Sequence, residues 1–220
     1  MSLGARAALA TLGALGLALL GTGLWLPAKA ELAQHLLNRA WDRTTEGAVA
    51  AKPWPWADTH PVARLTLPGG AEPLTVLAGA SGRNLAFAPA LMDGSALPGT
   101  PGVTVIAGHR DTHFRSLANL AIGDELTLER PDGSMLRYAV TALDVVDSER
   151  AELRLDADES VIALVTCWPF DALTVGGKWR YVVTARFRGI ASSSATGTGA
   201  STITMRVEKK TKEPKHEDGD

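Results

Sequence analysis

The chain has 220 residues, 45% of them hydrophobic and 21% charged, which is typical of a globular protein with one domain of ordinary size plus appendages. A formal net charge of -2 excludes a broad basic surface for nucleic acid. A single cysteine excludes an internal disulfide framework and a zinc site built mainly from cysteines.

The beginning of the chain predicts a membrane anchor. Residues 7–26 contain no charged side chain, and twenty residues at helical rise cross a bilayer core of about 30 Å. Trp25 stands near the far interface, and the positive-inside rule places the chain after Lys29 outside the cytoplasm. Residues 28–30 resemble a signal-peptide cleavage site, but the apolar run is longer than a usual signal core. We therefore expect residues 1–30 to form a cytoplasmic stub and an uncleaved single-pass anchor.

Residues 31–60 predict a helical and Trp/Pro-rich linker. In residues 31–42 apolar side chains recur at helical spacing, which indicates a short helix leaving the membrane. Residues 51–61 contain three prolines, which oppose a regular helix, and two tryptophans, which favour docking on the neighbouring domain. The apolar helix face is expected to comprise Leu32, Leu36, Leu37 and Ala40.

Residues 61–188 predict a mostly β domain. Short runs rich in β-branched residues, punctuated by Gly and Pro, are typical of a sandwich or barrel. Asp132-Gly133 indicates a hairpin turn, and only residues 89–93 and 114–120 look helical. The sequence shows no internal repeat, Gly-rich phosphate loop or nucleic-acid module. The predicted strands are residues 62–67, 74–78, 103–107, 125–129, 136–140, 161–166 and 181–187.

Residues 189–220 predict a disordered tail. Residues 189–204 are rich in Gly, Ser, Thr and Ala, and the charged segment that follows has no apolar periodicity. The folded domain is therefore expected to end near Arg188.

Cys167 follows the predicted strand 161–166 and precedes a loop. A strand end is where a barrel exposes side chains at its rim, so a thiol there can meet substrate. The alternative is a buried structural cysteine, which is common in protein cores.

Two basic groups stand at other strand boundaries. His109 follows strand 103–107, after Gly108, which permits close approach of another chain segment, and Arg180 begins the strand after the cysteine loop. An imidazole can activate a thiol, while a guanidinium favours the thiolate and stabilises an acyl-transfer oxyanion. We interpret Cys167, His109 and Arg180 as a nucleophilic centre that the fold assembles.

Three segments together resemble the sortase family. The segment ALVTCWPF resembles the sortase cysteine signature, with Ala163 where the signature has threonine. The segments AGHRDTHF and GGKWRYVVTA resemble the histidine segment and the arginine strand of the family, in the same order. With its anchor and Trp/Pro segment the chain is most similar to the class GN sortases of Gram-negative bacteria. Over residues 61–188 the resemblance implies a closed eight-stranded β-barrel with short helices, preceded by a transmembrane helix.

The resemblance also implies the role of each residue. Cys167 would be the nucleophile, His109 the general acid/base, and Arg180 the group that stabilises substrate and oxyanion. The implied reaction is attack on the Thr–Gly carbonyl of an LPxTG-like sorting signal, followed by transfer of the thioacyl intermediate to an amine acceptor, without a cofactor. The side chains expected at the substrate site are Thr166, Trp168 and Phe170.

The implied partners are a substrate protein with a C-terminal sorting signal, an amine acceptor and the membrane, but no nucleic acid. The implied location is the inner membrane, with the catalytic domain facing the periplasm. For Trp168 and Phe170, packing under the loop is an equal alternative to walling the substrate groove.

Alternative interpretations assign other roles to these residues. An L,D-type transpeptidase is disfavoured, because Thr166 and Trp168 flank the thiol where that family has a His-Gly-Cys segment. A non-catalytic anchored β-module would dock a partner through its Trp/Pro segment. His109 and His113 lack a third metal ligand at a convincing spacing. For the acidic residues 149–159 we expect a solvated face rather than a calcium site.

Overall fold

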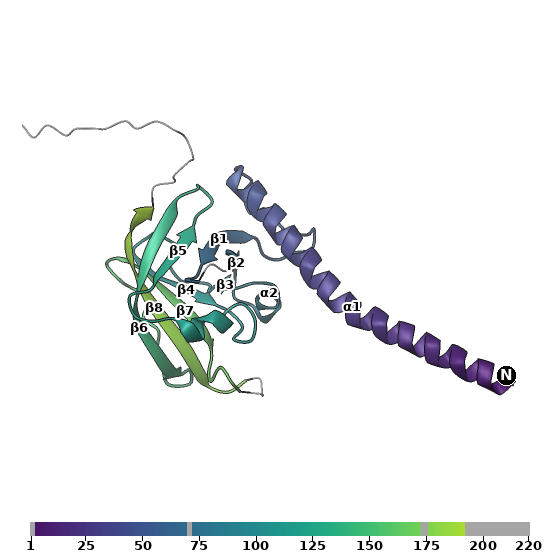
Figure 1. Ribbon diagram of the computed structural model, residues 1–220. Helices are drawn as coiled ribbons and strands as arrows, with labels where there is room; N and C mark the ends of the chain where they lie inside the picture. The colour runs from purple at the N-terminus through teal and green to yellow at the C-terminus, as the bar shows by residue number, and fades with distance from the viewer. Residues whose placement is uncertain (1–2, 70–71, 173–175, 192–220) are drawn as a thin grey trace, which may run out of the picture.

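The computed structural model describes residues 3–69, 72–172 and 176–191 of the chain (Figure 1). It shows a closed β-barrel with one long helix beside it. Most of the tail predicted to be disordered, residues 192–220, lies outside the described part.

The helix α1, Leu3–Thr45, is a single element of 43 residues. The helix predicted over residues 31–42 is confirmed, but it is part of a much longer element, because α1 continues through Pro27. A proline removes one backbone donor from a helix, but good helix formers follow Pro27 and carry the helix onward. Most side chains of residues 5–26 lie outside the described part. Among the residues that are described, no helix is long and apolar enough to cross a membrane.

The C-terminal half of α1 packs on the barrel, whereas its N-terminal half extends away from it (Figure 1). Trp41 is fully covered, and the Arg64 guanidinium lies 5.4 Å from the centroid of its ring. Leu32 belongs to the predicted apolar face but is 58% exposed, so the docked face is rotated from the expected one. The buried positions of α1 recur at helical spacing: Ala33, Leu37, Ala40 and Trp41.

Eight strands close the barrel in the order β1-β2-β3-β4-β7-β8-β6-β5. The expected closed eight-stranded barrel is therefore confirmed. Adjacent strands pair antiparallel except β2 with β3 and β4 with β7, which are parallel. The strands are β1 Pro61–Thr66, β2 Leu74–Ala78, β3 Ala90–Leu91, β4 Gly102–Ala107, β5 Glu125–Glu129, β6 Met135–Asp147, β7 Ser160–Cys167 and β8 Trp179–Ala191.

Alternating side chains of the strands fill the barrel interior, as half-buried strands require. Along β7, Ile162 and Leu164 point into the main core, whereas Val161 and Ala163 belong to a second apolar cluster on the outer face of the sheet. This alternation fixes which residues at the end of β7 face inward and which face outward.

The prediction of a helix over residues 89–93 is wrong. The helix α2, Gly82–Leu85, lies earlier and begins at Ser81, whose hydroxyl accepts from the Asn84 amide. Residues 90–91 form β3, because both neighbouring strands offer backbone partners there. The second predicted helix corresponds to the short 3-10 helix η1, Arg115–Asn119.

Strands β6 and β8 extend well beyond their predicted limits and pair with each other along their whole length. Two bulges, at Arg137/Tyr138 and at Val140/Ala142, shift the register of this pair. Each bulge breaks the period-two alternation on which the strand prediction relied, so the prediction stopped near Val140. The Asp132-Gly133 turn between β5 and β6 is confirmed, with the Arg130 amide donating to the Ser134 carbonyl at 3.0 Å.

Candidate active site

Cys167 is the last residue of β7 and is a half-buried free thiol. Residues 162 and 164 of this strand point into the barrel, so residue 167 lies on the outer face, in line with Val161 and Ala163. The alternative of a cysteine sealed in the core does not hold, because the thiol is at the rim and partly open to solvent.

His109 is exposed and lies at the same edge of the sheet. Strands β4 and β7 are parallel with Ala107 opposite Val165, and the Gly108 amide donates to the Val165 carbonyl at 3.1 Å. Continuing this register by two residues brings His109 abreast of Cys167. The close approach expected at Gly108 comes from the Phe114 ring, because a Cβ at residue 108 would lie 2.7 Å from Phe114 Cδ2.

Arg180 is the direct partner of Cys167 in the antiparallel pair of β7 and β8. Residues directly opposite each other in such a pair carry their side chains on the same face, so the guanidinium starts beside the thiol. In this conformation its Nη1 donates to the carbonyls of Gly177, at 2.7 Å, and Trp179, at 3.0 Å. The structure thus brings the three predicted residues to one edge of the sheet: Cys167 and Arg180 are paired on β7 and β8, and His109 follows two residues after the end of the adjacent β4.

Thr166 points inward and is buried, 2% exposed. Its hydroxyl donates to the Gly108 carbonyl at 2.7 Å. The residue before the thiol is therefore bonded to the residue before the imidazole. Thr166 therefore supports the two segments from inside the barrel and does not reach the outer face where a substrate would bind.

Trp168 and Phe170 pack against each other and against Tyr181. Ring centroids are 5.6 Å apart for Trp168–Phe170, 5.6 Å for Trp168–Tyr181 and 5.1 Å for Phe170–Tyr181. Phe170 and Tyr181 also contact the main core. This arrangement favours the alternative that the two aromatic residues support the loop from below.

Arg110 is a residue whose importance sequence reasoning missed. It is 4% exposed, and its guanidinium bonds the Asp111 carboxylate and the carbonyls of Pro169 and Ala172. The hydrogen bond that the guanidinium donates to the Asp111 carboxylate raises the pKa of Arg110, and the same bond lowers the pKa of Asp111. The only available signal was the adjacent Arg-Asp pair directly after His109.

An outer apolar surface lies beside the thiol edge, on β4 and β7. Segments before and after these strands cover it: the Met92 amide donates to the Val105 carbonyl at 2.8 Å, and the Val103 amide donates to the Leu155 carbonyl at 2.9 Å. Its members are Val103, Val105, Val161 and Ala163, with Met92, Leu155, Ala157, Val165 and Val182 partly buried around them.

His113 lies in the turn after β4 rather than on a helix shared with His109. Burial lowers its pKa, and the Thr112 hydroxyl lies 3.2 Å from its Nδ1. Within the part of the chain that the structure describes, no three His, Cys, Asp or Glu side chains gather closely enough to hold a metal ion. The acidic residues of 149–159 are exposed, as a solvated face predicts.

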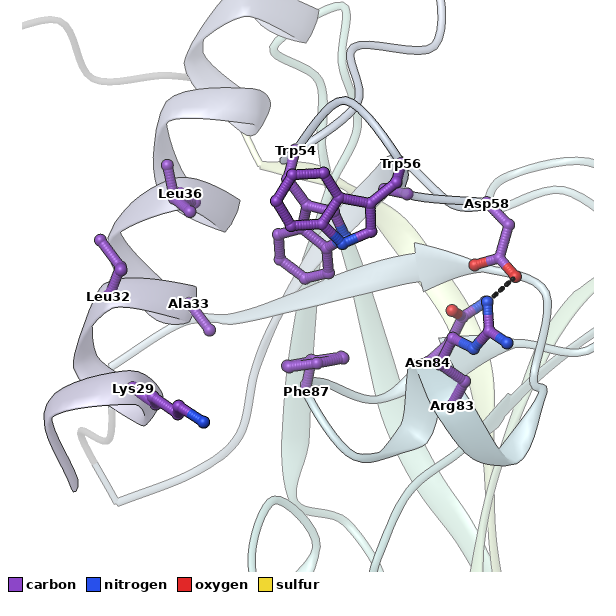
Figure 2. A pocket seen from close by; sticks show the side chains of 11 residues that line it. Lys29, Leu32, Ala33, Leu36, Trp54, Trp56, Asp58, Arg83, Asn84 and Phe87 are labelled. Carbon is purple, nitrogen blue, oxygen red and sulfur yellow. Dashed lines mark hydrogen bonds and ion pairs between the residues drawn. The ribbon is translucent and has the colours of Figure 1, made fainter. Parts of the chain in front are cut away.

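An apolar groove of about 480 Å³ lies between α1, the Trp/Pro segment and α2 (Figure 2). Trp54 packs edge-on against Phe87 with ring centroids 4.9 Å apart, so one of the two predicted tryptophan contacts with the domain is confirmed. Trp56 is 80% exposed. The ion pair of Arg83 with Asp58, at 3.4 Å, closes one end of the groove (Figure 2).

Comparison with known proteins gives the same fold. The sortase domain family model matches residues 65–188. Sortase D of Bacillus subtilis is 32% identical over 87 residues, which are 39% of this chain and 43% of that protein, so the match spans less than half of the curated relative.

Solved structures are similar over more of the chain. The Clostridium perfringens Sortase D5 transpeptidase has a TM-score of 0.56 at 21% identity, over 72% of this chain and 99% of its own. Sortase C-1 of Actinomyces oris has a TM-score of 0.52 at 28% identity, over 59% of this chain and 73% of its own.

A closed barrel that carries a thiol, an imidazole and a guanidinium at one edge has the components of a cysteine-dependent acyl transferase. The family match covers more than half of the chain, and the chain belongs to the sortase family of cysteine transpeptidases.

Proposed function

We propose that this sortase is an active cysteine transpeptidase in which Cys167 is the nucleophile, His109 the general acid/base and Arg180 the oxyanion stabiliser. The observation that carries the proposal is that three strands end or begin at one edge of the sheet. Cys167 and Arg180 are register partners on β7 and β8, and His109 follows the end of β4, which pairs parallel with β7. Chance placement of these three residue types would seldom put them on one edge and one face.

In the first half-reaction, the Cys167 thiolate attacks the carbonyl carbon of a peptide bond in the substrate. Electrons move onto the carbonyl oxygen, where the Arg180 guanidinium stabilises the charge. When the intermediate collapses, the C–N bond breaks and His109 protonates the departing amine. The products are a thioester on Cys167 and a released C-terminal peptide.

In the second half-reaction, an incoming amine attacks the thioester carbonyl. His109 takes the proton from this amine, a new amide bond forms, and the C–S bond breaks to restore the thiolate. Dividing one difficult step into two easier ones is the general advantage of covalent catalysis. The exposure of His109 suits this role, because both amines must reach its ring from solvent.

Arg180 must change its hydrogen bonds for this role. Its Nη1 now donates to the carbonyls of Gly177, just before β8, and of Trp179, the first residue of β8. A guanidinium carries five N–H donors, so it can turn another edge toward the oxyanion while keeping a bond to the turn. The carbonyls of Gly177 and Trp179 would then keep the guanidinium on the thiol side of β8.

For the substrate we propose an LPxTG-like sorting signal at the C-terminus of an exported protein. The partly buried Val165 and Val182 lie on the outer face next to the thiol edge. They offer an apolar floor for the leucine and proline of such a signal, while the scissile carbonyl reaches Cys167. The acceptor is an amine.

We also propose that residues 7–26 anchor the protein in the inner membrane, with the barrel in the periplasm, as in class GN sortases. The support is the sequence: the segment has no charged residue, and Trp25 and Lys29 stand at its end. Trp25 is 60% exposed and Lys29 Nζ lies 4.7 Å from its ring centroid, an arrangement suited to a membrane interface.

The proposed chemistry is tested by mass spectrometry of the full chain incubated with a library of LPxTG-like peptides. A thioester adduct on Cys167, which disappears when an amine is added and a transpeptidation product forms, is the expected result. Cys167→Ala should form neither adduct nor product. A non-catalytic β-module would bind peptide equally well before and after that substitution, and this outcome would overturn the proposal.

A further inference from the structure

The Arg110 guanidinium carries a positive charge and is buried, which destabilises a protein unless the charge has partners. Arginine is seldom fully buried, and an unpaired charge inside a protein is strongly destabilising. Here the side chain is 4% exposed, and each part of the guanidinium has a partner. Nε and Nη2 donate to the two Asp111 carboxylate oxygens at 2.9 and 3.2 Å, Nη2 also donates to the Ala172 carbonyl at 3.0 Å, and Nη1 donates to the Pro169 carbonyl at 2.6 Å.

These bonds join two segments that are remote in the sequence. Arg110 directly follows His109, and Pro169 and Ala172 belong to the loop that follows Cys167. The residue pairs are 59 and 62 positions apart along the chain.

A second link joins the same two segments on the other side of the site. The Thr166 hydroxyl, just before Cys167, bonds the Gly108 carbonyl, just before His109, at 2.7 Å. His109 and Cys167 are therefore each bracketed by a cross-link before and after them. Two links hold relative position and orientation, whereas one link would leave the loops free to pivot.

We infer that Arg110 is a positioning residue of the reaction, which clamps the turn carrying His109 to the loop that follows Cys167 and so holds the imidazole at proton-transfer distance from the thiol and the amine. This inference rests on the proposed roles of Cys167 and His109. Arg110 acts through its hydrogen bonds to the two segments. Arg180 lies on the other side of Cys167, on β8, and has the different role of stabilising the oxyanion.

The clamp requires a guanidinium rather than a positive charge alone. A planar fork can meet a carboxylate along one edge and carbonyls along another, whereas a lysine ammonium is a single point on a flexible stem. Proton transfer needs donor and acceptor within about 3 Å, and a misplacement of about 1 Å can cost about a hundredfold in rate. Arg110→Lys keeps the charge and removes the clamp.

The experiment compares Arg110→Lys with wild type in a peptide transpeptidation assay, at a temperature well below the unfolding midpoint of each protein. We expect kcat to fall about tenfold to a hundredfold, while KM stays within about twofold, because the outer apolar surface is untouched. The matched control is Arg83→Lys, the same substitution in the exposed ion pair of Arg83 with Asp58, which should leave kcat unchanged. Wild-type kcat in folded Arg110→Lys, with only a lower melting temperature, would show a purely structural role.

A second measurement separates position from thiol reactivity. Alkylation of the single cysteine by iodoacetamide needs neither peptide nor amine, so it reports only on the activation of the thiol, and its rate in Arg110→Lys should fall much less than kcat. If the alkylation rate fell by the same factor as kcat, Arg110 would act on the reactivity of the thiol itself. That result would overturn the positioning role.

If Arg110→Lys does not fold, Asp111→Ala tests the same clamp from its exposed end, since Asp111 is 60% exposed. Loss of the carboxylate frees one edge of the guanidinium, so kcat should fall less than in Arg110→Lys, with KM unchanged. The melting temperature should also fall, because the buried guanidinium loses its counter-ion. Full activity in Asp111→Ala would contradict the clamp. Failure of wild type to form a thioester on Cys167 would instead refute the proposed function.

Discussion

Arg180→Lys should remove most of the catalytic activity and leave the fold intact. Arg180 is half-buried, and its two hydrogen bonds to described residues reach carbonyls of an exposed turn. Water or the lysine ammonium can replace those bonds, so the free energy of unfolding should change by less than about 1 kcal/mol. What lysine cannot supply is a second donor edge aimed at the oxyanion while the first remains on the turn.

The size of the loss follows from the position of the residue. In an antiparallel pair the Cα atoms of opposite residues lie about 4.5–5.5 Å apart, so the Arg180 guanidinium can reach an oxyanion formed on Cys167. Removing one oxyanion donor costs about 10²–10³ in kcat, which corresponds to about 2.7–4 kcal/mol. We therefore expect kcat to fall at least about a hundredfold, with a smaller change in KM.

The assay is cleavage of a fluorogenic LPxTG-like peptide, with urea denaturation of the same samples. Arg186→Lys is the matched control, because Arg186 lies on the same strand, is exposed, and forms a surface ion pair with Glu159. It should keep wild-type turnover. Arg180→Lys with near-normal kcat would refute the role assigned to the guanidinium, and an equal loss in Arg186→Lys would attribute the effect to β8 as a whole.

Two further predictions concern the support of the site. Thr166→Val should lower the free energy of unfolding by about 1–3 kcal/mol, measured by urea denaturation, because it leaves the buried Gly108 carbonyl without its hydroxyl donor. Thr166→Ser keeps the hydroxyl and should lose clearly less; equal losses would contradict the hydrogen-bond argument. Burial lowers the pKa of His113 below its unfolded-state value of about 6.5, so the unfolded state binds more protons in acid and the free energy of unfolding should fall as pH drops from about 7 to 5. In His113→Gln this slope should become shallower, although not flat because burial also lowers the pKa of His60, and an unchanged slope would show that His113 does not contribute.

The barrel and its active edge could be predicted from the sequence because both depend on local signals. β-branched runs marked β1, β4 and β7, and Asp132-Gly133 marked the hairpin between β5 and β6. Cys167 stands at a strand boundary that these runs define. The family resemblance then supplied the closure and the strand number, which local patterns do not contain.

The errors occurred where tertiary pairing overrides local pattern. Residues 90–91 are too few to give a period, and they form β3 only because β2 and β4 present free backbone groups on either side. The bulges between β6 and β8 interrupt the alternation that a sequence pattern can detect. The helix predicted over residues 31–42 is part of the longer α1, which passes through Pro27, since a single missing donor does not end a helix flanked by good helix formers.

Arg110 illustrates a different limit of sequence reasoning. Nothing in the segment AGHRDTHF distinguishes a buried arginine from a solvated one, because its acceptors at Pro169 and Ala172 come from a segment about 60 residues later. The parallel pairing of β4 with β7 makes those acceptors adjacent, and it also makes His109 adjacent to Cys167. The hairpin of β5 and β6 separates the two strands along the chain, so no local segment contains both reactive groups. The proposed catalytic site therefore exists only when the barrel has closed, and residues that secure the contact between β4 and β7 act on catalysis without touching the substrate.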